Sequence, residues 1–297
     1  MTKSVFAQDS TVGQRQIYRF DSVEKILYEA SSRAHLYNDA DFIFALTSRL
    51  DSLMPDEGVL SLDIFDTLLL RDNSSELRRF LEVGGCMALL APGSTPVDAF
   101  LARYLATKAS YRAGARVNGC GEGSLSEIHR TASRLLGWGD SLTEKFVEAE
   151  LQHESCRMSV NQILIEYSIR HRQRGGLVIL VSDMYMHASQ IKVLLEKLGV
   201  DNEIFHYIVS SADTKLSKGT GGIFALIGES LGVESSRFLH VGDSIKGDFV
   251  NPRAAGWRSL HLPIPRIEVD ERRRDHLETA QHLQRAFNLA VDIALPK

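Results

Sequence analysis

The chain has 297 residues, of which 44% are hydrophobic, and its formal net charge is −4 at pH 7. This length and composition allow one large or two moderate domains, and they exclude a surface drawn as a whole to nucleic acid or to anionic lipid. No apolar run in the sequence approaches the ~20 residues that a membrane span requires. Residues 1–16 have no apolar core behind their basic residue, so we expect no signal peptide.

Three cysteines, Cys86, Cys120 and Cys156, stand far apart and show no paired Cys or His spacing. They indicate a reduced compartment and do not fit a disulfide framework or a zinc site. The one dense basic run, residues 272–274, has an acidic residue on each side and is typical of a solvated helix face. We therefore expect a cytoplasmic protein with no nucleic-acid partner and no membrane partner.

Residues 1–56 are predicted to form a helical N-terminal extension. Apolar residues recur there at roughly helical spacing in two runs, which Asn38 and Asp39 separate. Residues 59–65 then form a short apolar run that contains one carboxylate, Asp63. We interpret this run as the first buried strand.

Residues 73–158 are predicted to form an inserted helical block, which we call the cap. Four apolar stripes follow one another there without strand signals. Within the cap, residues 117–123 alternate glycine with other residues as a dinucleotide-binding fingerprint does, but no strand precedes them. A mobile loop is the better interpretation, and its position makes it a candidate to face the substrate.

From residue 159 onward, helices and short apolar strands alternate regularly. The predicted strands are 177–181, 204–209, 238–241 and 258–262, and the predicted helices are 160–172, 187–198, 222–231 and 249–255. Such alternation implies a parallel sheet covered by helices on both faces. The expected fold is an α/β, three-layer Rossmann-like core made of residues 57–72 and 159–263, with the cap inserted into it. Residues 264–297 are predicted to form a polar, helical C-terminal tail.

Polar side chains end or follow these apolar segments, where an open parallel sheet binds its ligands. They are Asp63, Ser182, Lys218, Asp243 and Asp248. A carboxylate can attack phosphorus and form an aspartyl-phosphate, and a divalent cation between two carboxylates turns their repulsion into a site with oxygen ligands. The hydroxyl and the ammonium group can hold phosphoryl oxygens and stabilise the charge of the transition state.

At these positions the chain resembles the haloacid dehalogenase-like (HAD) hydrolase superfamily. That superfamily carries an Asp-x-Asp-x-Thr motif, a Ser or Thr at a strand end, a Lys before a helix, and a Gly-Asp-x-x-x-x-Asp motif. The matching residues here are Asp63 and Thr67, Ser182, Lys218, and Gly242, Asp243 and Asp248. The resemblance implies that Asp63 is the catalytic nucleophile and that Ser182 and Lys218 are its catalytic partners.

The resemblance also implies a Mg²⁺ ion as cofactor. Its ligands would be the carboxylates of Asp63 and Asp243 together with the backbone carbonyl of Phe65. Asp248 would support the waters of the metal, or it would support Lys218.

One position departs from the phosphatases of the superfamily, which place a second Asp, an acid/base, two residues after the nucleophile. This chain has Phe65 there, and Asp66 falls where the pattern usually has Gly. An aromatic residue at this position is similar to the true dehalogenases, but their last motif lacks the paired metal acids that this chain keeps. A metal-dependent phosphatase is therefore favoured over a metal-independent 2-haloacid dehalogenase. We expect slow hydrolysis, unless Asp66 or a cap residue supplies the proton.

These observations predict a magnesium-dependent phosphatase acting on a small phosphorylated metabolite, because a cap that closes over the site selects small substrates. The second hypothesis is a catalytically weak HAD-fold binding or scaffold protein in a glycan pathway. Residues 63–69 and 182–185 also resemble HAD proteins found with bacterial polysaccharide glycosyltransferases. On that hypothesis the helical extensions are contact surfaces for a homo-oligomer or a glycan-pathway partner.

Three further residues are candidates for substrate binding, each with an alternative. Arg71 can reach a substrate phosphate, or it can be a surface charge beside the hinge of the cap. Asp183 can cap its turn or orient a catalytic group. Asp66 points ~100° away from Phe65 in a helical turn, so it takes the acid/base role only if the loop has a changed shape. His240 is expected to be a core histidine rather than a metal ligand.

Overall fold

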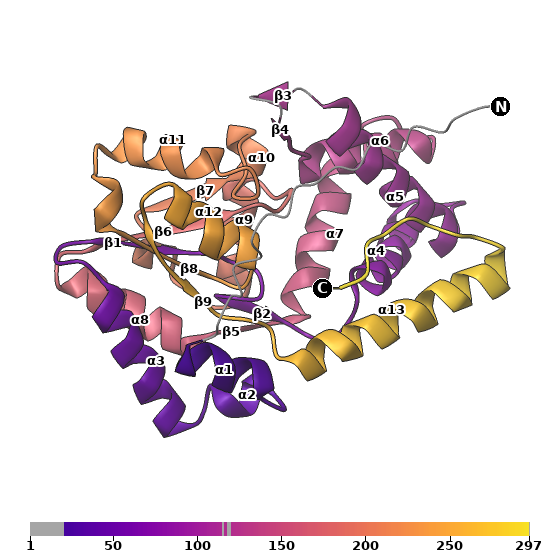
Figure 1. Cartoon of the computed structure of the whole chain (residues 1–297). Coiled ribbons are helices and arrows are strands. Elements are labelled where there is room, and N and C mark those ends of the chain that lie inside the picture. Colours follow the sequence, from indigo (N-terminus) through magenta and orange to yellow (C-terminus); the bar gives the residue numbers. More distant parts are fainter. Residues whose placement is uncertain (1–20, 115, 118–119, 297) are drawn as a thin grey trace, which may run out of the picture.

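The central sheet has five parallel strands, and β1 lies in its middle. A computed structural model describes residues 21–114, 116–117 and 120–296, and in it the strand order is β7-β6-β1-β8-β9 (Figure 1). The strands are β1 Val59–Leu62, β6 Leu177–Ser182, β7 Tyr207–Ser210, β8 Phe238–Gly242 and β9 Arg258–His261. β1 pairs in parallel with β6 on one side and with β8 on the other. The predicted parallel α/β sheet is confirmed.

Helices cover both faces of this sheet, which gives the three layers expected (Figure 1). Val59 of β1 and Val181 of β6 pack with Phe224 of α11 on one face. Leu60, the neighbour of Val59, points to the other face and belongs to a larger cluster that includes Leu46 of α3 and residues of α8 and α9. The helices that accompany the sheet are α3 Ala40–Leu53, α8 Gln162–Gln173, α9 Ala188–Lys197, α10 Ser211–Thr214, α11 Gly222–Leu231 and α12 Asn251–Ala254.

Two predicted elements begin three or more residues away from the expected start. The strand predicted at 204–209 begins at Tyr207, because Asn202–Ile204 form a 3₁₀ turn. The helix predicted at 249–255 begins earlier, as a π-helical turn at Ile245–Val250 that continues into α12. This second shift matters for function, because it determines where Asp248 lies.

The described part of the N-terminal extension is helical, as predicted. Its first helices are α1 Ser22–Glu29 and α2 Arg33–Leu36. Before α1, the Asp21 carboxylate accepts a hydrogen bond from the N–H of Glu24, and the Glu24 carboxylate accepts one from the N–H of Asp21. Asp39, which the sequence places between two helical runs, caps α3 by accepting the N–H of Phe42. The signal-peptide prediction concerns residues outside the described ones.

Among the described residues, the cap has four helices, and two short antiparallel strand pairs lie within it or where it joins the core. The helices are α4 Glu76–Leu90, α5 Pro96–Ala113, α6 Leu125–Leu135 and α7 Thr143–Ser155. The chain leaves the core through β2 (Leu69–Arg71) and returns through β5 (Met158–Val160), which pairs with it. A second pair, β3 (Arg116–Val117) and β4 (Cys120–Gly121), lies between α5 and α6. The sequence shows no signal for these strands, because strands of two or three residues carry no periodic pattern.

The C-terminal tail contains one long helix, α13 (Arg266–Phe287), which runs from the core to the cap (Figure 1). Its buried side chains recur every three or four residues and are mostly polar: Glu268, Arg272, His276, Thr279 and Leu283. The interpretation of 272–274 as a solvated face was wrong for Arg272, which is buried. A buried face made of polar residues has no apolar stripe by which a sequence could reveal it. Among all the described residues, no helix is long and apolar enough to cross a membrane.

Candidate active site at the carboxyl edge of the sheet

The segments singled out in the sequence meet at the carboxyl edge of the sheet, where ligands bind in open parallel sheets. Asp63 follows β1, and its N–H donates to the carbonyl of Val241 in β8 at 2.8 Å. Asp243 follows β8 and Ser182 ends β6. Lys218 stands in the loop between α10 and α11. Three neighbouring strands and one loop thus place four of the predicted residues at one edge.

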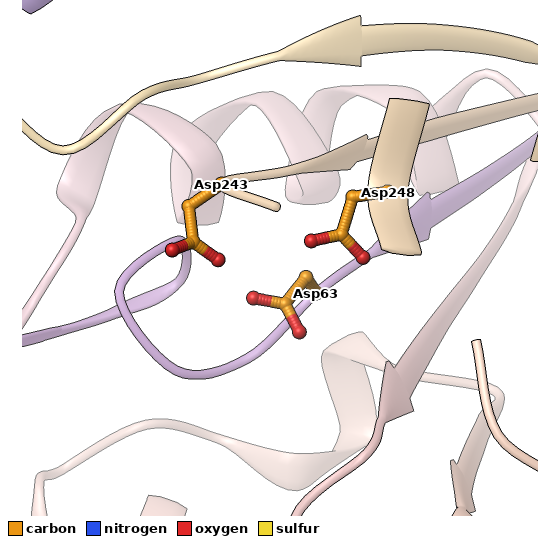
Figure 2. Close-up of side chains that lie close together, drawn as sticks. All are labelled: Asp63, Asp243 and Asp248. Carbon is orange, nitrogen blue, oxygen red and sulfur yellow. The ribbon is translucent and has the colours of Figure 1, made fainter. Parts of the chain in front are cut away.

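Three carboxylates form a cluster that can hold a metal ion. Asp63, Asp243 and Asp248 each offer an oxygen, and these oxygens lie within 4.8 Å of one another; Figure 2 shows the carboxylates turned toward a common centre. Asp248 reaches it from the π-helical turn, where its Oδ2 accepts the N–H of Ser244 at 2.9 Å. A Cβ at Gly242 would lie 2.3 Å from Asp248 Cγ, so only glycine at that position leaves room for this carboxylate.

Lys218 joins two of these carboxylates. Its Nζ contacts Asp63 Oδ1 and lies 2.6 Å from Asp248 Oδ1. The loop around it is held by Asp183, whose two oxygens accept the N–H groups of Lys218 (2.6 Å) and Gly219 (2.9 Å). Asp183 therefore orients a catalytic group, which was one of its two predicted roles. Each of its oxygens accepts one hydrogen bond in this way, and its substrate-binding role stays a prediction.

The formal charge of the cluster is more negative than positive, since the buried carboxylates of Asp63 and Asp248 and the partly buried carboxylate of Asp243 face the ammonium group of Lys218. Burial raises the pKa of Asp63 to about 7, although Lys218 opposes the shift. Burial and the neighbouring carboxylates raise the pKa of Asp243 well above its usual range. Burial would also raise the pKa of Asp248, but Lys218 and His240 outweigh it and lower that pKa.

A hard cation fits this donor set. Asp63 Oδ2 is buried and has no hydrogen-bond partner among the described residues. An unpaired carboxylate oxygen in such a place is unfavourable unless a cation meets it. Divalent hard cations take carboxylate oxygens as ligands, so the predicted residues Asp63, Asp243 and Asp248 suit Mg²⁺ chemically.

Two histidines contact residues of the carboxylate cluster. His240 is buried, lies 2.8 Å through Nδ1 from Ser61 Oγ, and lies 3.0 Å through Nε2 from Asp248 Oδ1. It is therefore a buried histidine that supports Asp248. His261 Nε2 donates to the carbonyl of Asp243 at 2.8 Å, and its Nδ1 lies 3.4 Å from a carboxylate oxygen of Glu24 in α1. The N-terminal helix α1 is thus connected to Asp243 through His261. No sequence signal indicates this contact.

Phe65 and Arg71 lie where the core meets the cap, and Ser182 lies at the end of β6. Ser182 Oγ accepts the N–H of Met184 at 3.1 Å, which leaves its own O–H to donate. The Phe65 ring is buried, and the guanidinium carbon of Arg71 lies 4.5 Å from its centre. Arg71 Nε lies 3.8 Å from the carboxylate of Glu154 in α7. Arg71 is thus mostly buried between core and cap and is not a surface charge, and its substrate-binding role stays a prediction.

Asp66 is not one of the three carboxylates of the cluster, although its charge contributes to the raised pKa of Asp243. Its two carboxylate oxygens accept hydrogen bonds from the guanidinium groups of Arg33 and Arg272. Burial would raise the pKa of Asp66, but the two arginines outweigh it and hold that pKa below its usual range. An ionised carboxylate with both oxygens engaged has no proton to give and no oxygen for a substrate. We therefore do not retain Asp66 as a substrate-binding residue or as the replacement acid.

The predicted loop 117–123 contacts the core beside Lys218. Of its residues, 118 and 119 lie outside the described ones, and part of the rest forms β3 and β4. Cys120 Sγ lies 3.2 Å from Ser217 Oγ, and Glu122 Oε2 accepts a hydrogen bond from Ser211 Oγ at 2.9 Å. The predicted substrate-facing position of this segment is compatible with these contacts, since Ser217 directly precedes Lys218.

Comparisons with known proteins point to one family. The family model described as haloacid dehalogenase-like hydrolase matches residues 62–256. No curated protein matches the chain. A solved 2-haloacid dehalogenase from Pseudomonas syringae pv. Tomato DC3000 is 16% identical with a TM-score of 0.50, and the match covers 69% of this chain and 85% of that one. A HAD family enzyme from Bacteroides thetaiotaomicron, solved with magnesium and inorganic phosphate, is 14% identical with a TM-score of 0.46 and coverages of 69% and 93%.

Proposed function

Because the chain belongs to the haloacid dehalogenase-like hydrolase family, we propose that it is a magnesium-dependent phosphatase that acts on a small phosphorylated metabolite through an aspartyl-phosphate. The observation that carries this proposal is the cluster of Asp63, Asp243 and Asp248 with Lys218 beside it. An excess of buried negative charge suits a site that binds a divalent cation together with a phosphoryl group. A location in the cytoplasm is part of the proposal.

Asp63, Lys218 and Ser182 each have a separate role in this reaction. A carboxylate oxygen of Asp63 attacks phosphorus, and the bond from phosphorus to the leaving oxygen breaks with its electron pair on that oxygen. Lys218 and the O–H of Ser182 hold the phosphoryl oxygens and stabilise the charge that develops on them. Water then attacks the aspartyl-phosphate, which releases inorganic phosphate and restores Asp63.

The metal would be held by Asp63, Asp243 and the carbonyl of Phe65, with Asp248 close by. When bound, Mg²⁺ would polarise a phosphoryl oxygen as a Lewis acid. Holding it would also remove the repulsion between the carboxylates, so that Asp63 is ionised and ready to attack at neutral pH.

Among the described residues, the site lacks a positioned acid to protonate the leaving group, so proton transfer should be slow. Phe65 fills the position from which a carboxyl group would protonate the leaving group, and Asp66 is held by two arginines. Positioned acids and bases typically contribute ~10²–10⁴-fold to a rate. We therefore propose slow turnover with an aspartyl-phosphate that persists long enough to be trapped by acid quench.

One observation favours a second candidate, a metal-independent 2-haloacid dehalogenase. Phe65 is an aromatic residue two positions after Asp63, where its resemblance to the true dehalogenases lies. The same site nevertheless keeps three metal-binding carboxylates, which carbon–halogen cleavage does not require. The likeness to the dehalogenase structure supports the fold alone.

Hydrolysis of para-nitrophenyl phosphate, with a parallel assay of halide release from a 2-haloacid, separates the candidates. We expect phosphate release that is abolished by a chelator and restored by Mg²⁺, and that Asp243→Asn removes. Asp140→Asn, which changes an exposed carboxylate paired with Arg134 on the cap, serves as the matched control. Halide release that persists in excess chelator would establish the dehalogenase. A folded protein inactive in both assays and in a phosphometabolite screen would favour the binding or scaffold role.

A further inference from the structure

Asp66 has an unusual backbone for its residue type. Its φ is +64°, in the left-handed region that glycine adopts most readily, and its N–H donates to the carbonyl of Leu69 at 2.7 Å. The superfamily pattern usually has Gly at this position. This conformation costs an aspartate some free energy, and contacts of its side chain can offset that cost.

Those contacts come from both ends of the chain. Arg272 of α13 donates from Nη1 to Asp66 Oδ2 at 2.9 Å and from Nη2 to Asp66 Oδ1 at 2.7 Å. Arg33, at the start of α2, donates from Nη2 to Asp66 Oδ1 and from Nη1 to the carbonyl of Asp66, both at 3.1 Å. Two guanidinium groups therefore fix the side chain and the peptide of one residue in the turn that follows Asp63.

The same arginines also hold the point where the chain leaves for the cap. Each donates to the carbonyl of Arg71 at 3.2 Å, and Arg272 Nε donates to the carbonyl of Asp72 at 3.2 Å. β2 ends at Arg71, just before α4. The turn after the nucleophile and the start of the cap are thus tied to one pair of side chains.

The positive and negative charges around Asp66 also balance. Glu268 of α13 accepts the N–H of Arg33 at 2.9 Å and its Nε at 2.7 Å. Two cations therefore face two anions, Asp66 and Glu268, and all four residues are buried. A balanced set of this kind needs no ligand, so its role is to hold the backbone in one conformation.

We propose that Arg33 and Arg272 are positioning residues of the active site: through Asp66 they set the turn that places the Asp63 carboxylate and the Phe65 carbonyl. This inference rests on the proposed function for its kinetic consequence. The N- and C-terminal helices are then parts of the active site's support, and contact with another protein is not needed to explain them.

Loss of the two arginines would affect catalysis by displacing the metal-binding oxygens. Without the arginine pair, the turn at 63–69 relaxes toward ordinary aspartate conformations, and the metal-binding oxygens lose their spacing. A misplacement of about 1 Å can lower a rate by roughly 10²-fold, and supporting residues around a metal typically change its affinity by about 10–100-fold. Substrate contacts are not removed, so kcat should fall while KM stays nearly constant.

The test uses Arg272→Gln, Arg272→Lys and Asp66→Asn in the full chain, with Arg274→Gln as the matched control. Arg274 is an exposed arginine two residues from Arg272 on the same helix, paired only loosely with Glu271 at 3.8 Å. The readouts are hydrogen exchange of residues 63–69 without metal, Mg²⁺ affinity by calorimetry without substrate, and kcat and KM.

We expect faster exchange at 63–69, Mg²⁺ affinity lowered by about 10-fold or more, and kcat lowered by about 10–100-fold for Arg272→Gln and Asp66→Asn. Arg272→Lys keeps the charge but not the paired hydrogen bonds, so it should fold and show a partial effect. Arg274→Gln should match the wild type in all three readouts.

The outcomes separate the two proposals. Folded variants with wild-type exchange and wild-type Mg²⁺ affinity would overturn the positioning role, as would equal effects from Arg274→Gln. If Arg272→Gln and Asp66→Asn do not fold, the Arg272→Lys readouts decide. If the wild type hydrolyses no phosphate ester, the proposed function fails, while exchange at 63–69 still decides whether the arginines fix the turn.

Discussion

Two buried clusters of charged side chains differ in how their charges are balanced. At the sheet edge, Asp63, Asp243 and Asp248 face a single cation, Lys218. Inside the cap, the carboxylate of Glu150 accepts hydrogen bonds from Arg103 Nε at 2.9 Å and from the Tyr185 hydroxyl at 3.0 Å, and lies 2.8 Å from His129 Nε2. Burial alone does not explain this difference, because most side chains of both clusters are buried.

This difference in charge balance indicates that the cluster at the sheet edge needs a ligand and that the Glu150 cluster does not. Both oxygens of Glu150 have partners within the protein, whereas Asp63 Oδ2 has none among the described residues. Paired buried charges hold a structure in place, and surplus buried charge of one sign is relieved by binding an ion of the other sign. We therefore expect substitutions at the sheet edge to change activity, and substitutions in the cap cluster to change stability.

The largest expected effect is loss of activity in Asp63→Asn. The amide keeps the shape of the side chain but cannot form the aspartyl-phosphate, so activity should fall by several orders of magnitude. The free energy of unfolding of the metal-free protein should stay the same or rise, because one of three mutually repelling carboxylates is gone. Steady-state kinetics and urea unfolding in a chelator measure the two effects.

Activity within ~10-fold of the wild type would overturn the assignment of Asp63 as nucleophile. Clear destabilisation of the metal-free protein would contradict the comparison itself. It would mean that Asp63 and Lys218 form a structural ion pair like that of Glu150 and Arg103.

Phe65→Asp should have the next largest effect, an increase of up to ~10²-fold in the rate at which the aspartyl-phosphate breaks down. The new carboxylate would lie near the guanidinium group of Arg71, which favours its ionised form and so suits a base that activates water. Acid quench after a single turnover measures the lifetime of the phosphoenzyme.

Phe65→Asn is the matched control, because it opens the same space without a carboxylate. If both variants speed breakdown equally, water access is the limiting factor. If neither does, and the wild type shows no trappable intermediate, a cap residue supplies the proton and the site is not limited at Phe65.

The sheet and the position of the candidate catalytic residues at its edge could be predicted from sequence because their signals are local. Each strand is a short apolar run, and Asp63, Ser182 and Asp243 stand where such runs end. Parallel strands bring their carboxyl ends together, so a one-dimensional pattern was sufficient to place these residues at one edge. The two strand pairs of the cap carried too few residues for any pattern.

The supporting contacts could not be predicted because they join polar residues that are distant in sequence. Asp66 is 33 positions from Arg33 and 206 from Arg272. Arg272 stands in a basic run whose neighbours are exposed, and the cap cluster joins Arg103, Glu150 and Tyr185 from different elements. Single-sequence patterns register apolar periodicity, and none of these contacts contributes to it.

Glu150→Gln should be the stability counterpart of Asp63→Asn. It leaves Arg103, which is fully buried, without its counter-ion, and breaking a buried pair in this way typically costs 3–5 kcal/mol. Urea unfolding measures the loss. Asp140→Asn is the control, because Asp140 pairs with Arg134 at the surface of the same cap and should cause no measurable change. A loss for Glu150→Gln as small as the control's would show that the cap cluster is no structural pair.

The smallest expected effect is the pH dependence of that stability difference. Burial would raise the pKa of Glu150, but Arg103 and His129 outweigh it and hold the pKa below its usual range. A carboxyl group that binds its proton more weakly when folded contributes stability above its unfolded pKa, ~4.3, and loses it as the pH falls toward the folded pKa. The difference between wild type and Glu150→Gln should therefore be constant from pH 8 to about 5, and then shrink by at most ~1.4 kcal/mol per pH unit. Burial lowers the pKa of His129, and Glu150 opposes that shift, so Glu150→Gln also changes the titration of this histidine. His129→Gln is therefore introduced into both proteins, so that the histidine does not contribute to the difference. Urea unfolding of both proteins between pH 3 and 8 measures the curve, and a difference that grows as the pH falls would show that Glu150 is not held ionised by Arg103.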